Sequence, residues 1–282
     1  MGFDEVATTL TTSQAFVHYS LFASMLALGA AFVFFLVEKE KILPDYRGTM
    51  VTSAIICGVA AVAYYFLTRN YDPAHDPNKA FPTDIRYFDW TVTTPLLVLK
   101  YPEMLRVRGI GLATKLILAD LFMIVTGFIG ELSGQTVNGH WVLNPGHTVT
   151  EHYVWGFIST LGYVVILFYV LGEAKKLAEA QPEPIHNGIV KMNRYLWSLW
   201  GVYPIVYIAE GISAGNPSLN LDWFNVLSSV ADIVNKVGFG ITAYLAVKAL
   251  SGDDQKSAER LPESAERLPE SAGRLPESAA RG

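Results

Sequence analysis

The 282-residue sequence is poor in cysteine and in charge. Its single cysteine, Cys57, excludes an intramolecular disulfide and any cysteine-based metal site, and we expect it to be a small buried residue. Only 17% of the residues are charged, against about 25% in soluble domains. The charged residues are missing from long continuous stretches, which indicates that these stretches lie in a lipid membrane. The mild net charge of −5 argues against a nucleic-acid partner.

The N-terminus also lacks the positively charged region that opens a cleavable signal peptide. Asp4 and Glu5 stand there instead. We therefore expect residues 1–13 to be an extracellular segment that precedes the first membrane span.

Seven stretches are long and apolar enough to be membrane-spanning helices, which need roughly 20 mostly apolar residues. None of them shows the alternating pattern of a strand. The sequence therefore predicts an all-α seven-transmembrane-helix bundle over residues 14–250. The predicted spans are 14–37, 47–68, 84–102, 111–132, 150–173, 188–212 and 222–249.

Lysine and arginine are concentrated in the odd-numbered loops, which by the positive-inside rule are cytoplasmic. This distribution predicts an N-terminus outside and a C-terminus inside. The basic residues of the first and third loops are Lys39, Lys41, Arg47, Arg106, Arg108 and Lys115.

Two segments outside the spans have a character of their own. Residues 133–149 are rich in Gly and Asn and predict a small hairpin on the outer face. Residues 251–282 repeat a seven-residue unit, SAERLPE, and a proline in every repeat prevents one continuous helix. We expect a disordered cytoplasmic tail there, with an artificial extension as the alternative.

The predicted third helix carries a polar stripe that an ordinary span would not have. Arg86, Asp89, Thr93 and Lys100 lie within about 60° of one another around the helix axis. A charge inside a span costs roughly 2.5–3.5 kcal/mol, so the stripe indicates a function. Snorkelling end charges would explain Arg86 and Lys100, but they would not explain Asp89.

The predicted seventh helix carries Asp232 and Lys236 near its middle, four residues apart on one face. A structural ion pair is one interpretation. The other is that an amine in an apolar site reacts with an aldehyde, and that Asp232 and Asp89 then supply counterions.

RYFDWTVTTPLL, WGVYPIVY and DIVNKVGFG, in the third, sixth and seventh helices, resemble signatures of microbial rhodopsins, and the resemblance covers residues 14–250. The sequence is similar to the bacterial proton pumps of the proteorhodopsin and xanthorhodopsin-like groups. The resemblance implies all-trans retinal bound to Lys236 as a protonated Schiff base. It also implies Asp89 as proton acceptor, Asp232 as second counterion, Arg86 as extracellular gate and Thr93 as a partner near Asp89.

The same resemblance implies a retinal pocket. Trp90 and Trp200 would enclose the polyene, Tyr64 and Tyr203 would bond Asp232, and Asp120 would be protonated and hydrogen-bonded. The remaining pocket positions are Trp155, a wall residue near the ionone ring, Tyr207, where some relatives have Trp, Met123 and Gly127 in the fourth helix, and Leu97, which suggests green absorption. On spacing alone, the aromatic stripe of the sixth helix is more typical of a core.

Three positions depart from the common pattern of outward pumps. Lys100 stands where a carboxylic proton donor is usual, and the resemblance to a small subgroup of pumps implies that it donates; the alternative is a snorkelling lysine. Ala63 stands where many relatives have a histidine beside the acceptor. Gly156 resembles the position that opens a carotenoid-antenna site, although it is also an ordinary packing residue.

The function predicted first is a light-driven outward proton pump, a transporter rather than an enzyme, in the bacterial cytoplasmic membrane. The alternative is a sensory photoreceptor that signals through a partner protein. Glu131 or Glu210 could release the proton, but solvated end charges are the more common interpretation of such residues. We expect a trimer or pentamer, no required protein partner and no metal.

Overall fold

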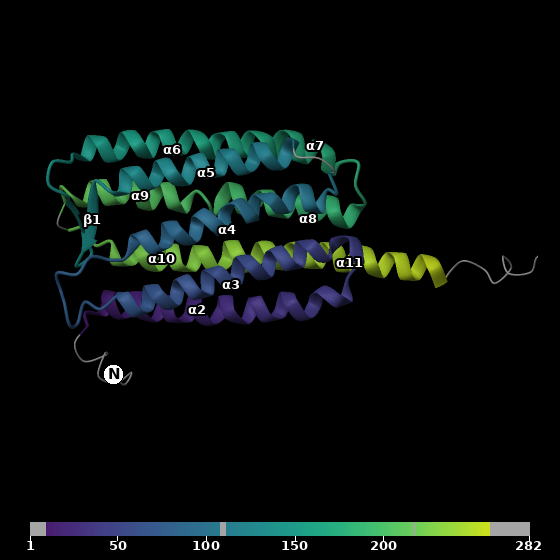
Figure 1. Ribbon diagram of the computed structural model, residues 1–282, viewed down its shortest axis with the longest axis horizontal. Coiled ribbons are helices and arrows are strands. Elements are labelled where there is room, and N and C mark those ends of the chain that lie inside the picture. The colour runs from purple at the N-terminus through teal and green to yellow at the C-terminus, as the bar shows by residue number, and fades with distance from the viewer. Residues whose placement is uncertain (1–9, 108–110, 217, 260–282) are drawn as a thin grey trace, which may run out of the picture.

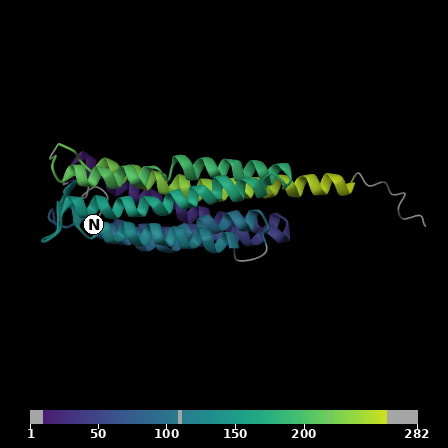
Figure 2. The same cartoon turned by 90° about the horizontal axis from the view of Figure 1, so that it is seen from above.

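The computed structural model describes residues 10–107, 111–216 and 218–259. Within these residues seven helical rods run side by side along the long axis of the molecule (Figures 1 and 2). The first four rods are α2 (Thr12–Glu38), α3 (Arg47–Asn70), α4 (Thr83–Met104) and α5 (Gly111–Glu131), with the short turns η1 (Lys39–Lys41) and η2 (Pro44–Tyr46) between α2 and α3. The fifth is α6 (Val149–Tyr169) with η3 (Val170–Ala174) and α7 (Lys175–Ala178), the sixth is α8 (Glu183–Ser198) with α9 (Val202–Ser213), and the seventh is α10 (Asp222–Ile233) with η4 (Val234–Gly238) and α11 (Phe239–Glu259).

The rods close into a ring. Each of the first five packs on the next in chain order, α9 packs on α6 and α10, α11 packs on α8, and α10 returns to α2. The polar stripes of α4 and of the seventh rod therefore face each other across the interior, while large apolar side chains such as Phe157 and Phe168 point outward. Apolar side chains on the outside and ionisable residues directed inward are the arrangement expected of a bundle in lipid.

Five rods are long and apolar enough to cross a membrane by length and composition, and the chain has the seven-helix membrane fold that the sequence predicts. These five are Thr12–Lys41, Pro44–Asn70, Gly111–Glu131, Val149–Ala178 and Asp222–Gly252. The third rod falls below that threshold because α4 carries a row of ionisable residues. The sixth does so because its helix is interrupted between α8 and α9.

The hairpin predicted in residues 133–149 is confirmed. Strand β1 (Gly134–Val137) pairs antiparallel with β2 (His140–Leu143). Asn138 and Gly139 form the turn with φ angles of 50° and 75°. Positive φ at both central residues is what a two-residue hairpin turn requires, and Asn-Gly adopts it readily. Trp141 on β2 is buried against the bundle and anchors the hairpin there.

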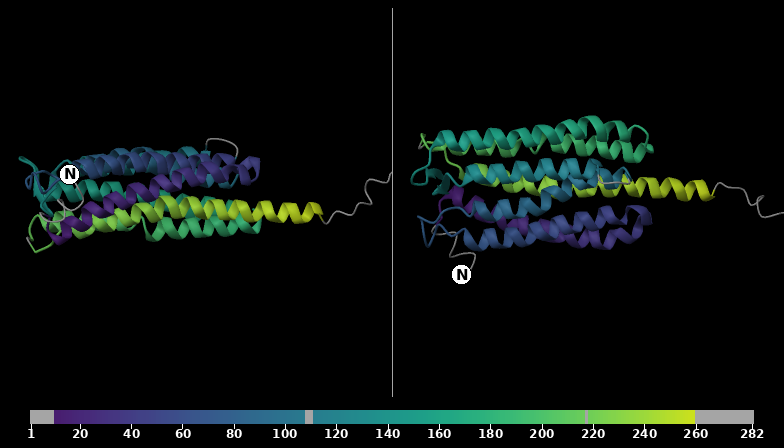
Figure 3. Two further views of the ribbon diagram at one scale, coloured as in Figure 1. Left: turned by 90° about the horizontal axis from the view of Figure 1, so that it is seen from below. Right: turned by 45° about the horizontal axis from the view of Figure 1, so that its top comes forward.

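The start of α2 and the end of α11 lie at opposite ends of the bundle, as an odd number of rods requires (Figure 1). We call these ends the hairpin end and the α11 end. Helix α11 projects beyond the other rods and continues to Glu259, past residue 250 where the sequence predicted a disordered tail to begin (Figure 3). The rest of that predicted tail, 260–282, and most of the predicted N-terminal segment, 1–9, lie outside the described residues.

Candidate functional site

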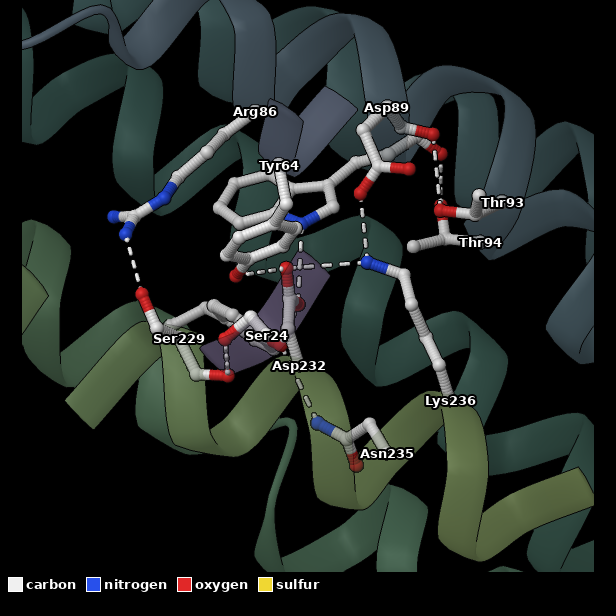
Figure 4. Close-up of polar contacts among 12 residues, drawn as sticks. Ser24, Tyr64, Arg86, Asp89, Thr93, Thr94, Ser229, Asp232, Asn235 and Lys236 are labelled. Carbon is white, nitrogen blue, oxygen red and sulfur yellow. Dashed lines mark hydrogen bonds and ion pairs between the residues drawn. The ribbon is translucent and has the colours of Figure 1, made fainter. Parts of the chain in front are cut away.

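A buried ion cluster lies at the centre of the bundle (Figure 4). The Lys236 Nζ donates to Asp89 Oδ2 at 2.7 Å and lies 3.1 Å from Asp232 Oδ2. The side chains of Lys236 and Asp89 are 1% exposed and that of Asp232 is 3% exposed. The sequence therefore predicted correctly that the charges of the third and seventh helices meet, and one ammonium group stands between two carboxylates.

The backbone at Lys236 is not a regular α-helix. Lys236 lies in η4, a π-helical turn between α10 and α11. Such single-turn insertions in helices often occur at functional sites because they displace one residue from the regular register. The fold therefore uses an irregular turn at the position where the amine meets both carboxylates.

The two carboxylates differ in their surroundings. The Tyr203 hydroxyl donates to Asp232 Oδ1 at 2.5 Å and the Tyr64 hydroxyl to Oδ2 at 2.8 Å. The Trp90 Nε1 also donates to Oδ1, at 3.4 Å. Donors directed at a carboxylate stabilise its charged form, so Asp232 is built to stay an anion.

Asp89 has fewer partners. Its Oδ2 accepts from Lys236, whereas its Oδ1 is buried and has no hydrogen-bond partner among the described residues. The Thr93 hydroxyl donates to the backbone oxygen of Asp89 at 2.9 Å. Of the two carboxylates, Asp89 is therefore the one with unused capacity to accept a proton.

Arg86 lies on the hairpin side of the cluster and contacts neither carboxylate. Its guanidinium donates to the Asn225 side chain at 2.8 Å and to the Ser229 hydroxyl at 3.1 Å. It also lies over the Phe81 ring, 4.6 Å from the centroid. With Lys236 and the two aspartates it makes a buried set of two positive and two negative charges, which offsets much of the cost of burying them.

Sequence reasoning missed Asn225 and Ser229, although the sequence contained a signal for them. Asn225, Ser229, Asp232 and Lys236 are separated by 4, 3 and 4 residues, which is the spacing of one helical stripe. Polarity along that stripe predicts that all four residues face the interior, as they do. Asn235, which donates to the Tyr203 hydroxyl at 3.4 Å, lies off the stripe and gave no such signal.

A cavity of about 310 Å³ begins at Lys236 and extends between the rods. Its volume lies at the lower end of the roughly 300–1,000 Å³ that small-molecule sites span. Its lining is mostly apolar and aromatic, and it also includes the charged residues Arg86, Glu131, Glu210, Asp232 and Lys236. Among the residues expected to form a pocket, those that line it are Trp90, Leu97, Met123, Gly127, Gly156, Trp200, Tyr203, Tyr207 and Lys236.

Three expected pocket residues do not line this cavity. The Tyr64 hydroxyl donates to Asp232, but Tyr64 is not part of the cavity lining. Asp120 is 0% exposed and accepts a hydrogen bond from the Thr94 hydroxyl at 2.8 Å, so it lies behind a wall residue. The prediction that Trp155 forms a wall is wrong for this cavity, because Trp155 lies beside Gly130 and its neighbour Gly156 faces the space instead.

The ring of Tyr207 lies close to the backbone of Gly156 on one side. A Cβ at Gly156 would lie 2.4 Å from Cε1 of the Tyr207 ring. The ring of Tyr207 stacks on that of His152 at 3.9 Å, and the Tyr207 hydroxyl donates to the His152 backbone oxygen. The glycine therefore lets an anchored aromatic ring approach α6 closely.

Glu131 and Glu210 are not solvated end charges, contrary to the more common interpretation of such residues. They are 5% and 9% exposed, and both line the cavity on the side of Arg86. Sequence position alone suggested surface residues because both lie near helix ends.

Lys100 lies in α4, on the α11 side of the cluster. It is 0% exposed and its amine donates to the Ser53 hydroxyl of α3. A snorkelling lysine keeps its ammonium in water. The burial of Lys100 therefore argues against the snorkelling alternative and shows an amine held inside the protein.

Known proteins resemble this chain over nearly its whole helical part. The family described as bacteriorhodopsin-like protein matches residues 15–250. Archaerhodopsin-3 of Halorubrum sodomense is 28% identical over 75% of this chain and 76% of its own length. The green-light absorbing proteorhodopsin of Gamma-proteobacterium EBAC31A08 is 28% identical over 80% of this chain and 84% of its own.

Solved structures agree with the sequence matches. The crystal structure of Exiguobacterium sibiricum rhodopsin gives a TM-score of 0.73 at 33% identity and covers 84% of this chain and 97% of that one. Xanthorhodopsin, described as a light-driven ion pump with dual chromophore, gives 0.74 at 26% identity and covers 87% and 98%.

Proposed function

The chain belongs to the bacteriorhodopsin-like family of light-driven, retinal-binding membrane proteins, and we propose that it pumps protons outward, from the α11 end to the hairpin end. The observation that carries the proposal is the buried amine of Lys236, which lies between two carboxylates of unequal surroundings. One carboxylate is fixed as an anion and the other has room for a proton. Because of this asymmetry, Asp89 would be the carboxylate that accepts a proton from the Lys236 nitrogen.

The residues of the cavity fit retinal. A mostly apolar space lined by Trp90 and Trp200 suits a polyene, and the Lys236 amine in its lining suits an aldehyde. The unpartnered Oδ1 of Asp89 adds an acceptor beside that amine. Bound retinal would supply light absorption and a light-driven change of shape.

The other steps belong to the side chains. Lys236 would hold the cofactor, and Asp232, bonded by Tyr64 and Tyr203, would keep a permanent negative charge beside it. Asp89 would accept the proton that leaves the Lys236 nitrogen. Arg86, positioned on Asn225 and Ser229, would favour onward movement of positive charge toward the hairpin end.

The proton would then be replaced from the α11 end. Lys100 is the buried amine on that side, and a neutral amine takes up and passes on a proton as a general acid-base group does. We propose Lys100 as the donor that restores the proton on the Lys236 nitrogen. The α11 end would face the cytoplasm, in agreement with the basic residues of the odd-numbered loops.

Cells that contain this protein and all-trans retinal are expected to acidify an unbuffered medium under illumination, and a protonophore should abolish the change. Asp89→Asn is expected to remove the acidification because it removes the carboxylate that has an unpartnered oxygen beside the Lys236 amine. The matched control is Asp72→Asn, an exposed aspartate outside the cavity, which should leave it intact. The measurement is the external pH, recorded with a glass electrode during illumination.

A coloured protein that leaves the external pH unchanged would contradict the pump. The sensory photoreceptor would then be the better assignment. Alkalinisation sensitive to the protonophore would instead reverse the proposed direction.

We also propose that a carotenoid antenna packs beside Gly156, which lines the cavity together with the outward-facing Phe157. Addition of a hydroxylated carotenoid should then add its absorption bands to the action spectrum of acidification. Gly156→Trp should remove those added bands. Gly172→Trp, in the same rod with open space around it, is the control and should keep them. An action spectrum that follows retinal alone in the unmodified protein would refute the antenna.

We place the protein in the bacterial cytoplasmic membrane, where a proton pump would add to the proton gradient. The exposed apolar faces of the rods would contact lipid and other copies of the chain in a trimer or pentamer.

A further inference from the structure

A carboxylate lies one helical turn beyond the Lys100 amine, at the α11 end of α4. Glu103 is partly exposed, whereas Lys100, three residues before it, is fully buried. One turn along a helix advances the chain by about 4.5 Å over three residues, on nearly the same face. Glu103 is therefore the group between the buried amine and the end of the bundle.

Helix α3 holds both side chains on one short stretch. The Thr52 hydroxyl donates to Glu103 Oε1 at 2.7 Å and the Thr49 hydroxyl to Oε2 at 3.2 Å. The next residue of this stretch, Ser53, accepts from Lys100 and donates to the Thr49 backbone oxygen at 2.9 Å. Glu103 and Lys100 are thus fixed against the same turn of α3.

Electrostatics connects the two groups as well. Lys100 takes part in no ion pair within 4.0 Å among the described residues, and Glu103 is the carboxylate whose charge acts on it. Glu103 in turn is acted on by Lys100. At the same end, the exposed Asp45 and Arg106 pair with each other at 2.6 Å.

We propose that Glu103 collects protons at the α11 end and delivers them to Lys100. This inference rests on the proposed function, in which Lys100 is the donor. Glu103 takes a proton from water and becomes a carboxylic acid. It then gives that proton to the neutral Lys100 amine, so that the products are a carboxylate and an ammonium ion. Thr49 and Thr52 are positioning residues that aim the carboxyl group.

The variant that tests the proposal is Glu103→Gln, which keeps the shape and the hydrogen-bond acceptor but cannot carry a proton. A positioned acid-base group contributes typically 10²–10⁴-fold to a proton transfer, and loss of the group that feeds the donor is expected to slow proton uptake by about tenfold or more. Uptake is measured with a pH-indicator dye after a flash, on full-length protein with retinal in lipid. Glu183→Gln, an exposed carboxylate at the same end, is the control and should leave uptake unchanged.

Two further readouts separate a proton carrier from a residue that is merely structural. Azide, a small mobile weak acid, should restore fast uptake in Glu103→Gln. In light-minus-dark infrared spectra, a carboxylic-acid band should be present in the wild type and in Glu183→Gln and absent from Glu103→Gln.

Unchanged uptake in Glu103→Gln, or slow uptake that azide does not restore, would overturn the role of Glu103 while leaving the pump intact. Failure of the pump itself is seen differently, as a wild type without light-driven pH change. Even then, an infrared band lost only in Glu103→Gln would support proton exchange at Glu103, and the absence of such a band would overturn it.

Discussion

Lys236→Ala is expected to abolish the visible absorption band that added retinal gives to the purified protein. Among the described lysines, Lys236 is the one that lines the cavity, and its amine is the group placed to react with an aldehyde. After borohydride reduction, the retinyl group of the unmodified protein should be found on the peptide that contains Lys236. Absorption spectra and peptide mass mapping measure both results.

The same substitution removes the cation between two buried carboxylates, and breaking a buried pair costs about 3–5 kcal/mol. Loss of colour could then reflect an unfolded protein. The double variant Lys236→Ala, Asp89→Asn removes one of the two negative charges and should recover much of the stability but none of the colour. Lys248→Ala, in the exposed part of the same rod, should keep the band. A retained band in folded Lys236→Ala would rule out Lys236 as the attachment site.

Much of this site could be predicted from the sequence because charged residues are rare in apolar helices. Asp89 and Lys236 stand out in their spans, and helical spacing assigns each to a face. Two polar faces in one bundle are expected to meet in its interior, because the outside of the bundle contacts lipid. The ion cluster is the result of that constraint.

Other features depend on how the rods sit against one another, which spacing does not specify. The burial of Glu131 and Glu210 depends on how α5 and α9 pack against the other rods of the ring. The absence of Trp155 from the cavity wall follows from the rotation of α6, which turns Gly156 toward the space. A rotation of a helix by about 100°, the angle between successive residues, changes which side chains face the cavity. A helix that is apolar on all sides has the same sequence pattern in either orientation.

The polar contacts between rods show the same limit. Ser53, Thr49 and Thr52 are weak signals in α3, since hydroxyl residues are ordinary in spanning helices. Their role as hydrogen-bond partners becomes evident only in the structure, where α4 places Lys100 and Glu103 beside them. The sequence identified the amine and the structure supplied its surroundings.

Lys100→Met is expected to slow proton replacement on the Lys236 nitrogen by roughly 10²–10⁴-fold, because it removes a positioned proton donor and keeps the side-chain volume. Transfer to Asp89 should stay fast, since Asp89 lies on the other side of the cluster, beside Lys236. The residual rate should fall about tenfold for each unit rise in pH, as direct uptake from water requires. Flash spectroscopy across a pH series measures both halves of the cycle.

Lys100→Arg distinguishes proton transfer from simple charge. Arginine keeps a positive charge that it does not release at any working pH, so a donor role predicts slow replacement in this variant as well. If the buried charge alone mattered, Lys100→Arg would behave like the wild type and Lys100→Met would not. Wild-type rates in both variants would show that Lys100 is a packing residue bonded to Ser53, and the proton would have to reach the Lys236 nitrogen by another route from the α11 end.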